Sequence, residues 1–178
     1  RQGPNLVADL DGDGDLDVYA GREIGINAGQ FWWNDGTGFF SPGQQLLFMG
    51  SATHALDLDQ DGLLDLLGET VAWGQGGGQF DSPIGLPGIF DLTEDRLDIG
   101  DIDGDGSLDL VYWPQTSDVY VLLQTAPRSF QTTTVEIEAP YSLSGLDDRR
   151  IFIDDYDDDG DNDVLAVPIL NNHKIGRI

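Results

Sequence analysis

Residues 9–17 read Asp-Leu-Asp-Gly-Asp-Gly-Asp-Leu-Asp, and their pattern, Asp-x-Asp-x-Asp-Gly-x-x-Asp, returns three more times in the chain. The later copies begin at Asp57 (DLDQDGLLD), Asp101 (DIDGDGSLD) and Asp155 (DYDDDGDND). Successive copies start 48, 44 and 54 residues apart, a spacing typical of proteins built from structural repeats. The sequence therefore predicts a repeat protein in which each repeat carries one acidic loop.

Each acidic loop gathers alternating carboxylates around a glycine, and this arrangement provides the hard oxygen ligands that Ca²⁺ prefers. The calcium loop of an EF-hand is the nearest alternative, but it requires a glutamate at its twelfth position. That position holds Ala20, Gly68, Tyr112 and Ala166 here, so the EF-hand pattern fails in every copy. Single Asp-Gly turns are common in proteins, but four complete copies favour calcium binding.

The segments around the loops are short, apolar and rich in Val, Leu, Ile and aromatic residues, which is typical of β-strands. Each loop is expected to join two strands of a hairpin, at residues 5–8 and 16–20, 53–56 and 64–67, 96–99 and 108–112, and 150–153 and 163–167. Third strands are expected at residues 30–33, 70–73 and 118–123, and fourth strands at residues 45–48, near 89–90 and at 133–137.

Four antiparallel strands in each repeat of about 40–50 residues are typical of a β-propeller blade. The predicted fold class is therefore all-β: a β-propeller or a segment of one, with about four blades of four-stranded antiparallel sheet. Residues 1–178 are expected to form a single repeat domain. Its approximate blades are residues 1–50, 51–92, 93–144 and 145–178, the last of them incomplete.

The acidic loops with their apolar strands, together with the Asn-Asp-Gly-Thr-Gly-Phe turn at residues 34–39, resemble the FG-GAP/VCBS repeats. Those repeats build the calcium-binding propeller of integrin α-subunits and of many secreted bacterial proteins. The resemblance covers nearly the whole chain and implies a Ca²⁺ ion in the first hairpin of each blade. Family members usually have about seven blades, whereas this chain has four copies of the loop.

The resemblance also implies a set of metal ligands. The aspartates at positions 1, 3, 5 and 9 of each loop are expected to supply carboxylate oxygens, and position 7 a backbone carbonyl. The glycine at position 6 is expected to have a positive φ, which lets the chain wrap the ion. The predicted ligands are Asp9, Asp11, Asp13, Asp15 and Asp17; Asp57, Asp59, Asp61, Leu63 and Asp65; Asp101, Asp103, Asp105, Ser107 and Asp109; and Asp155, Asp157, Asp159, Asp161 and Asp163. Up to four structural Ca²⁺ ions are the predicted cofactors.

Composition excludes several classes of partner. The formal net charge is −25 with only 8 Lys and Arg residues, so the chain is expected to bind no nucleic acid and to avoid anionic membranes. The chain has no cysteine, so it has neither a disulfide framework nor a thiolate metal site. It also has no run of 18 apolar residues, and no membrane insertion is expected.

No catalytic set is recognised in the sequence, and the chain is predicted not to be an enzyme. It has no Gly-x-Ser-x-Gly elbow and no cysteine nucleophile. Carboxylate pairs that hydrolyse glycosides need one acid held neutral in an apolar setting. Aspartates crowded around a metal ion are in the opposite situation.

The predicted function is a calcium-stabilised scaffold for protein recognition or adhesion, placed outside the cell, at the cell surface or in the periplasm. This placement follows from the resemblance and from the weak calcium affinity of many extracellular modules. One alternative is a carbohydrate-binding propeller lectin, since the aromatic residues Phe31, Trp32, Trp33, Trp73 and Trp113 either stack on sugars or fill the core. Another is an accessory domain or structural subunit of a larger assembly, completed by further blades or by another subunit.

Overall fold

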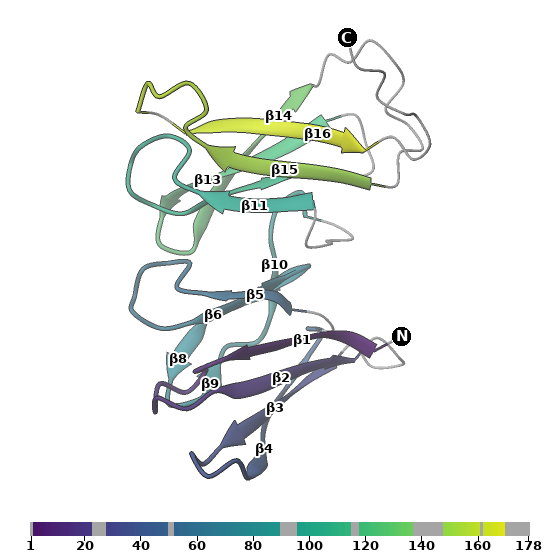
Figure 1. Ribbon diagram of the computed structural model, residues 1–178, viewed down its shortest axis with the longest axis vertical. Coiled ribbons are helices and arrows are strands. Elements are labelled where there is room, and N and C mark those ends of the chain that lie inside the picture. The colour runs from purple at the N-terminus through teal and green to yellow at the C-terminus, as the bar shows by residue number, and fades with distance from the viewer. Residues whose placement is uncertain are drawn as a thin grey trace. The chain divides into compact units, whose positions relative to one another are not determined.

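The computed structural model describes residues 2–22, 28–49, 52–89, 96–114, 118–136, 148–160 and 162–169. The chain divides into two compact units, residues 1–89 and residues 90–178, and each is described by itself. Apart from the 3-10 residue Arg96, the regular secondary structure in the described ranges is β, and every strand pair is antiparallel (Figure 1). The prediction of an all-β protein with antiparallel sheets is confirmed. The described part of the chain contains no helix with the length and apolar character that a membrane crossing requires.

The first sheet is a four-stranded meander. Its strands are β1 (Gln2–Ala8), β2 (Asp17–Arg22), β3 (Ala28–Asn34) and β4 (Phe40–Leu47), hydrogen-bonded in that order. The acidic loop at residues 9–16 joins β1 to β2, and the Asn-Asp-Gly-Thr-Gly turn joins β3 to β4. All four strands expected for the first repeat are therefore present, although the fourth begins earlier than predicted and ends at Leu47.

The second sheet and a short hairpin complete the first unit. The sheet contains β5 (Ala52–Leu56), β6 (Asp65–Gly68), β7 (Thr70–Ala72) and β10 (Ile84–Gly85), and the hairpin contains β8 (Gly74–Gly76) and β9 (Gln79–Phe80). Strand β10 is hydrogen-bonded to β7, so it closes the sheet as its fourth strand.

Two strand positions expected in the second repeat are wrong. The third strand was expected to continue to Trp73, but β7 ends at Ala72 because the next residues turn into the β8–β9 hairpin. The fourth strand was expected near residues 89–90, but the structure places it at β10. Ile89 instead follows a turn and donates a hydrogen bond to the carbonyl of Leu86 (3.3 Å), and residue 90 lies outside the described residues.

An aromatic core joins the two sheets of the first unit. Tyr19 and Phe31 are cross-strand neighbours on one face of the first sheet, and both are fully buried. They pack against Leu66 and Ala72 of the second sheet. Phe31 also stacks on Phe80 of the β8–β9 hairpin, with ring centroids 4.7 Å apart.

The second unit repeats this organisation. Its four-stranded sheet contains β11 (Leu97–Gly100), β12 (Asp109–Tyr112), β13 (Asp118–Ala126) and β14 (Ser129–Glu136), and its two-stranded sheet contains β15 (Asp148–Asp154) and β16 (Asp163–Ile169). Acidic loops join β11 to β12 and β15 to β16, so the predicted hairpins are confirmed in both repeats. The end of the last predicted repeat, residues 170–178, lies outside the described residues.

The buried cluster that joins the two sheets of the second unit is aliphatic apart from one tryptophan. Val111, Trp113 and Val119 are buried and pack with Ile151 of the two-stranded sheet. The backbone N–H of Ile153 donates to the Asp98 carboxylate (2.8 Å), and this bond ties β15 to β11. A Cβ on Gly100 would lie 3.0 Å from Cγ2 of Ile153, so the two strands approach closely at this glycine.

Candidate metal centre

Each of the four acidic loops brings three carboxylates together. In each group, one oxygen from every carboxylate lies within 4.8 Å of the others. Loops 1 and 2 (residues 9–17 and 57–65) do so with positions 1, 3 and 5, and loops 3 and 4 (residues 101–109 and 155–163) with positions 1, 3 and 9. The groups are Asp9, Asp11 and Asp13; Asp57, Asp59 and Asp61; Asp101, Asp103 and Asp109; and Asp155, Asp157 and Asp163.

Backbone N–H groups hold these carboxylates in the same way in every loop. The glycine N–H at position 6 donates to Oδ2 of the first aspartate, over 3.0, 2.9, 3.0 and 3.0 Å in loops 1 to 4. The N–H at position 5 donates to Oδ1 of the aspartate at position 3, over 3.1, 3.2, 3.3 and 3.2 Å. The four copies therefore share these two hydrogen bonds as well as one sequence pattern.

Position 7 takes part in this scheme through its N–H. Asp15, Leu63 and Ser107 donate to the carboxylate at position 5 of their own loops, over 2.9, 2.9 and 2.7 Å. The equivalent Asp161 lies outside the described residues. The carbonyl ligands expected at position 7 remain predictions.

The aspartate at position 9 has a structural role that the sequence did not reveal. Asp17, Asp65 and Asp109 have no exposed surface. Both oxygens of Asp65 accept backbone hydrogen bonds, one from Leu58 in the loop (2.9 Å) and one from Gly74 beyond the third strand (2.8 Å). The same two bonds form in loops 1 and 3, from Leu10 and Asn34 to Asp17 and from Ile102 and Gln124 to Asp109. This carboxylate therefore fastens the loop to the third strand.

The sequence could not have identified the donors near the third strand that bond to position 9. They are backbone N–H groups, and they belong to three different residue types: Asn34, Gly74 and Gln124. In loop 4 the same aspartate, Asp163, is exposed and accepts from Tyr156 (3.2 Å). Position 9 is thus both a predicted ligand and an anchor of the sheet.

Two buried carboxylate oxygens show where a cation fits. Oδ1 of Asp57 and Oδ1 of Asp101 are buried and accept no hydrogen bond. In loops 1 and 4 the equivalent oxygen accepts from Gly12 (2.9 Å) and from Asp159 (3.1 Å). A buried anionic oxygen without a donor costs free energy, and a bound cation would remove that cost. The donor set is entirely oxygen, so its chemistry fits Ca²⁺ rather than a metal that prefers nitrogen or sulfur.

Burial and mutual repulsion disfavour the ionised form of several of these carboxylates. Burial raises the pKa of Asp65 to about 6, and burial also raises the pKa of Asp109. The pKa of Asp11 is raised by burial first, and then by the negative charges of neighbouring aspartates. Each of these groups would hold its negative charge more readily beside a cation.

These shifts predict that the pH dependence of stability changes sign with calcium. Without metal, folded Asp65 keeps its proton up to a pH of about 6, whereas the unfolded chain loses it near 3.8. The stability from this group is therefore present below pH 3.8 and is lost as the pH rises through about 6, so Tm should fall over that interval. In millimolar calcium Tm should rise instead, because the ion binds the deprotonated carboxylates. Melting curves across this pH range, with and without chelator, check the prediction. If Tm changed with pH in the same direction under both conditions, the prediction would be contradicted.

The glycine at position 6 has the predicted backbone conformation. Its φ is +97° at Gly14, +90° at Gly62, +90° at Gly106 and +96° at Gly160. Position 4 also has a positive φ, including the two non-glycine residues Gln60 (+61°) and Asp158 (+60°). The sequence did not predict this second left-handed position, since only two of the four copies have glycine there.

Substitutions at these two positions of loop 2 should have opposite effects. Gly62→Ala is expected to lower the free energy of unfolding by about 1–3 kcal/mol, because a side chain is strained at this φ. Gln60→Gly should be neutral or stabilising by up to about 1 kcal/mol, because it relieves a left-handed non-glycine residue. Urea denaturation of both variants measures the difference. A loss of stability in Gln60→Gly as large as that in Gly62→Ala would contradict the loop geometry.

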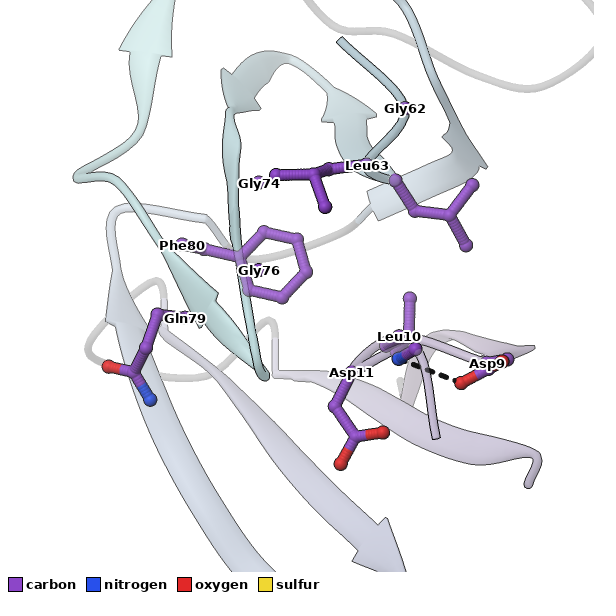
Figure 2. Close-up of a pocket in the computed structure, with 11 residues that line it drawn as sticks. Asp9, Leu10, Asp11, Gly62, Leu63, Gly74, Gly76, Gln79 and Phe80 are labelled. Carbon is purple, nitrogen blue, oxygen red and sulfur yellow. Dashed lines mark hydrogen bonds between the residues drawn. The ribbon is translucent and has the colours of Figure 1, made fainter. Parts of the chain in front are cut away.

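A cavity of about 310 Å³ adjoins the first loop (Figure 2). Asp9, Leu10 and Asp11 line it on the side of loop 1, and Gln79 and Phe80 line it on the side of the β8–β9 hairpin. Loop 2 contributes the segment from Gly62 to Leu64. The cavity thus combines carboxylates with one aromatic ring.

The tryptophans are mostly core residues. Trp73 and Trp113 are buried, as expected for residues that fill the interior, and Trp33 packs against the buried cluster of the first unit. Trp32 is exposed, because it points to the side of the sheet opposite to that of Trp33, the next residue of β3. Among the described tryptophans, Trp32 is the one with an exposed ring.

Comparison with known proteins agrees with this geometry. Residues 9–68 match the family model described as FG-GAP-like repeat. The matched segment begins at the first aspartate of loop 1 and ends with β6, so it contains loops 1 and 2. A comparison with curated proteins found no match. The resemblance predicted from the acidic loops is confirmed: the chain contains an FG-GAP-like repeat at residues 9–68.

Proposed function

We propose that this chain is a calcium-stabilised β-propeller, or a segment of one, that serves as a scaffold for extracellular protein recognition or adhesion. The observation that carries the proposal is the repeated loop, in which three carboxylates converge in each of four copies. The unpaired buried oxygens of Asp57 and Asp101 support a cation at the centre of such a loop. On this proposal each loop binds one Ca²⁺ ion in the first hairpin of a blade.

The proposed ions are structural rather than regulatory. Two carboxylates about 4 Å apart repel each other by about 4 kcal/mol at an effective dielectric constant near 20. A divalent cation replaces this repulsion with attraction and fixes the hairpin that carries the loop. Extracellular calcium modules often bind with dissociation constants of about 10⁻⁴–10⁻³ M, so this use of calcium suits a protein outside the cell. The FG-GAP-like repeat supports the same placement.

The recognition function is tested by binding in calcium and in chelator. The immobilised protein would be exposed to a panel of extracellular proteins and to a glycan panel, each in millimolar calcium and in excess chelator. The proposal expects binding to a protein that is lost on chelation and restored by calcium. Absence of binding to every protein on the panel would count against recognition. Binding confined to glycans would support the carbohydrate-binding alternative, for which the cavity at Asp11 and Phe80 is the candidate site.

A further inference from the structure

Loops 3 and 4 are in direct contact within the second unit. The side-chain amide of Asn162, at position 8 of loop 4, donates a hydrogen bond to the backbone carbonyl of Asp101 over 2.7 Å. Asp101 is the first residue of loop 3, and it lies 61 positions before Asn162 in the chain. The fold of the second unit, rather than the local sequence, therefore joins two of the candidate calcium loops.

The strands that lead into these two loops are also joined. The backbone N–H of Ile153, just before loop 4, donates to Oδ2 of Asp98, just before loop 3, over 2.8 Å. Gly100 lets the two strands approach closely here, since a Cβ on it would lie 3.0 Å from Cγ2 of Ile153. These contacts fix the start of one loop relative to the start of the other.

The hydrogen bond between the loops is particular to loop 4. The other three loops have leucine at position 8, namely Leu16, Leu64 and Leu108. A leucine side chain has no donor, and Leu64 of loop 2 packs instead against the buried apolar cluster of the first unit. The repeat pattern therefore does not require an amide at this position, and Asn162 adds a polar link between neighbouring loops.

Both partners of this hydrogen bond are tied to predicted metal ligands. Asp101 carries the buried Oδ1 that accepts no hydrogen bond and that a cation would satisfy. Asn162 directly precedes Asp163, whose carboxylate lies with those of Asp155 and Asp157 in loop 4. An ion that binds Asp163 restricts Asn162 and, through it, the backbone of Asp101. An ion that binds Asp101 restricts Asn162 in turn, so either ion orders residues that the other loop needs.

We propose that loops 3 and 4 bind calcium cooperatively and that Asn162 couples them. The inference rests on the proposed calcium binding and adds its regulation, because the second unit then takes up two ions over one narrow range of calcium concentration. Coupling between two binding sites is reciprocal, so an ion in either loop raises the affinity of the other by the same factor. Asn162 acts as a positioning residue, since it holds the backbone of loop 3 and is not itself a predicted ligand.

Calcium titration of the metal-depleted chain, isotope-labelled at its glycine nitrogens and followed by NMR, tests this proposal. The N–H groups of Gly106 and Gly160 each donate to the first aspartate of their own loop, so their signals report loops 3 and 4 separately. In the wild type both signals should change over the same range of calcium concentration. Asn162→Leu installs the residue that the other loops have, and it should raise the midpoint of the Gly106 signal at least about 2-fold, as expected for the loss of one exposed hydrogen bond.

A second substitution shows whether the effect passes between the loops. Asp155→Ala removes the first aspartate of loop 4 and with it a predicted ligand of that site. In an otherwise wild-type chain it should also raise the Gly106 midpoint at least about 2-fold, because loop 3 then binds without help from loop 4. In a chain that already carries Asn162→Leu, the same substitution should leave the Gly106 midpoint unchanged.

Tyr156→Phe is the matched control, because it removes an exposed hydroxyl from loop 4 and keeps the link from Asn162 to Asp101. Its midpoints should equal those of the wild type, and Asn162→Ala repeats the test if Asn162→Leu fails to fold. Equal Gly106 midpoints in the wild type, Asn162→Leu and Asp155→Ala would overturn the coupling and leave calcium binding intact. Gly106 and Gly160 signals that do not respond to calcium at all would overturn both the coupling and the proposed calcium binding.

Discussion

Chelation of calcium is expected to lower the Tm of this protein by more than about 20 °C. A site that is saturated about 100-fold above its dissociation constant stabilises the folded state by about 2.7 kcal/mol. Four such independent sites would contribute about 11 kcal/mol, which is comparable with the whole stability of a typical domain. A change of 1 kcal/mol shifts Tm by about 2–4 °C in a chain of this size. Scanning calorimetry in millimolar calcium and in excess chelator gives the two values.

Magnesium provides the control for this experiment. It prefers a smaller octahedral site with several retained waters, so it should restore less of the lost Tm than calcium does. Without metal, the repulsion between neighbouring carboxylates destabilises each loop, as among the clustered Asp57, Asp59 and Asp61. A melting curve that is the same with calcium and with chelator would show that the ions have no structural role.

Asp65→Ala is expected to lower the free energy of unfolding by about 3 kcal/mol or more, even in calcium-free buffer. The carboxylate is fully buried and accepts the N–H groups of Leu58 and Gly74. Its removal leaves two buried donors without an acceptor, each costing about 1–3 kcal/mol. It also removes the bond between loop 2 and Gly74, the first residue of β8. Urea denaturation in chelator measures this contribution apart from any effect on metal binding.

Asp163→Ala is the matched control, because Asp163 occupies the same position in loop 4. It is exposed, and Tyr156 donates to it over a longer distance of 3.2 Å. Water can replace an exposed acceptor, so the loss in metal-free buffer should be below about 1 kcal/mol. Equal losses in the two variants would mean that burial and the bond from Gly74 contribute little to stability at Asp65.

The parts of the fold that local sequence determines were predictable. A loop of alternating aspartates around a glycine requires tight backbone turns, and the flanking apolar runs are long enough for paired strands. The hairpins at all four loops and the positive φ of Gly14, Gly62, Gly106 and Gly160 follow from this local chemistry. These features depend on residues within about twenty positions of one another along the chain.

The features that the sequence did not predict depend on contacts across strands. The anchor role of Asp65 needs the N–H of Gly74, and a backbone group carries no signature in the sequence. The early end of β7 follows from the β8–β9 hairpin, in which Phe80 leaves the sheet to stack on Phe31. The alternation of side chains along a strand predicted that one of two adjacent tryptophans could be exposed. The packing of the second sheet decides that Trp32 is the exposed one.

The occupancy of the loops by calcium is the central claim, and calorimetric titration of the metal-depleted protein tests it most directly. The wild type is expected to bind four Ca²⁺ ions per chain, one for each copy of the acidic pattern. Asp57→Ala and Asp101→Ala should each bind one ion fewer, because each removes the carboxylate whose buried oxygen has no other partner. A wild type that binds no calcium, or variants that bind as many ions as the wild type, would contradict the assignment of these loops as calcium sites.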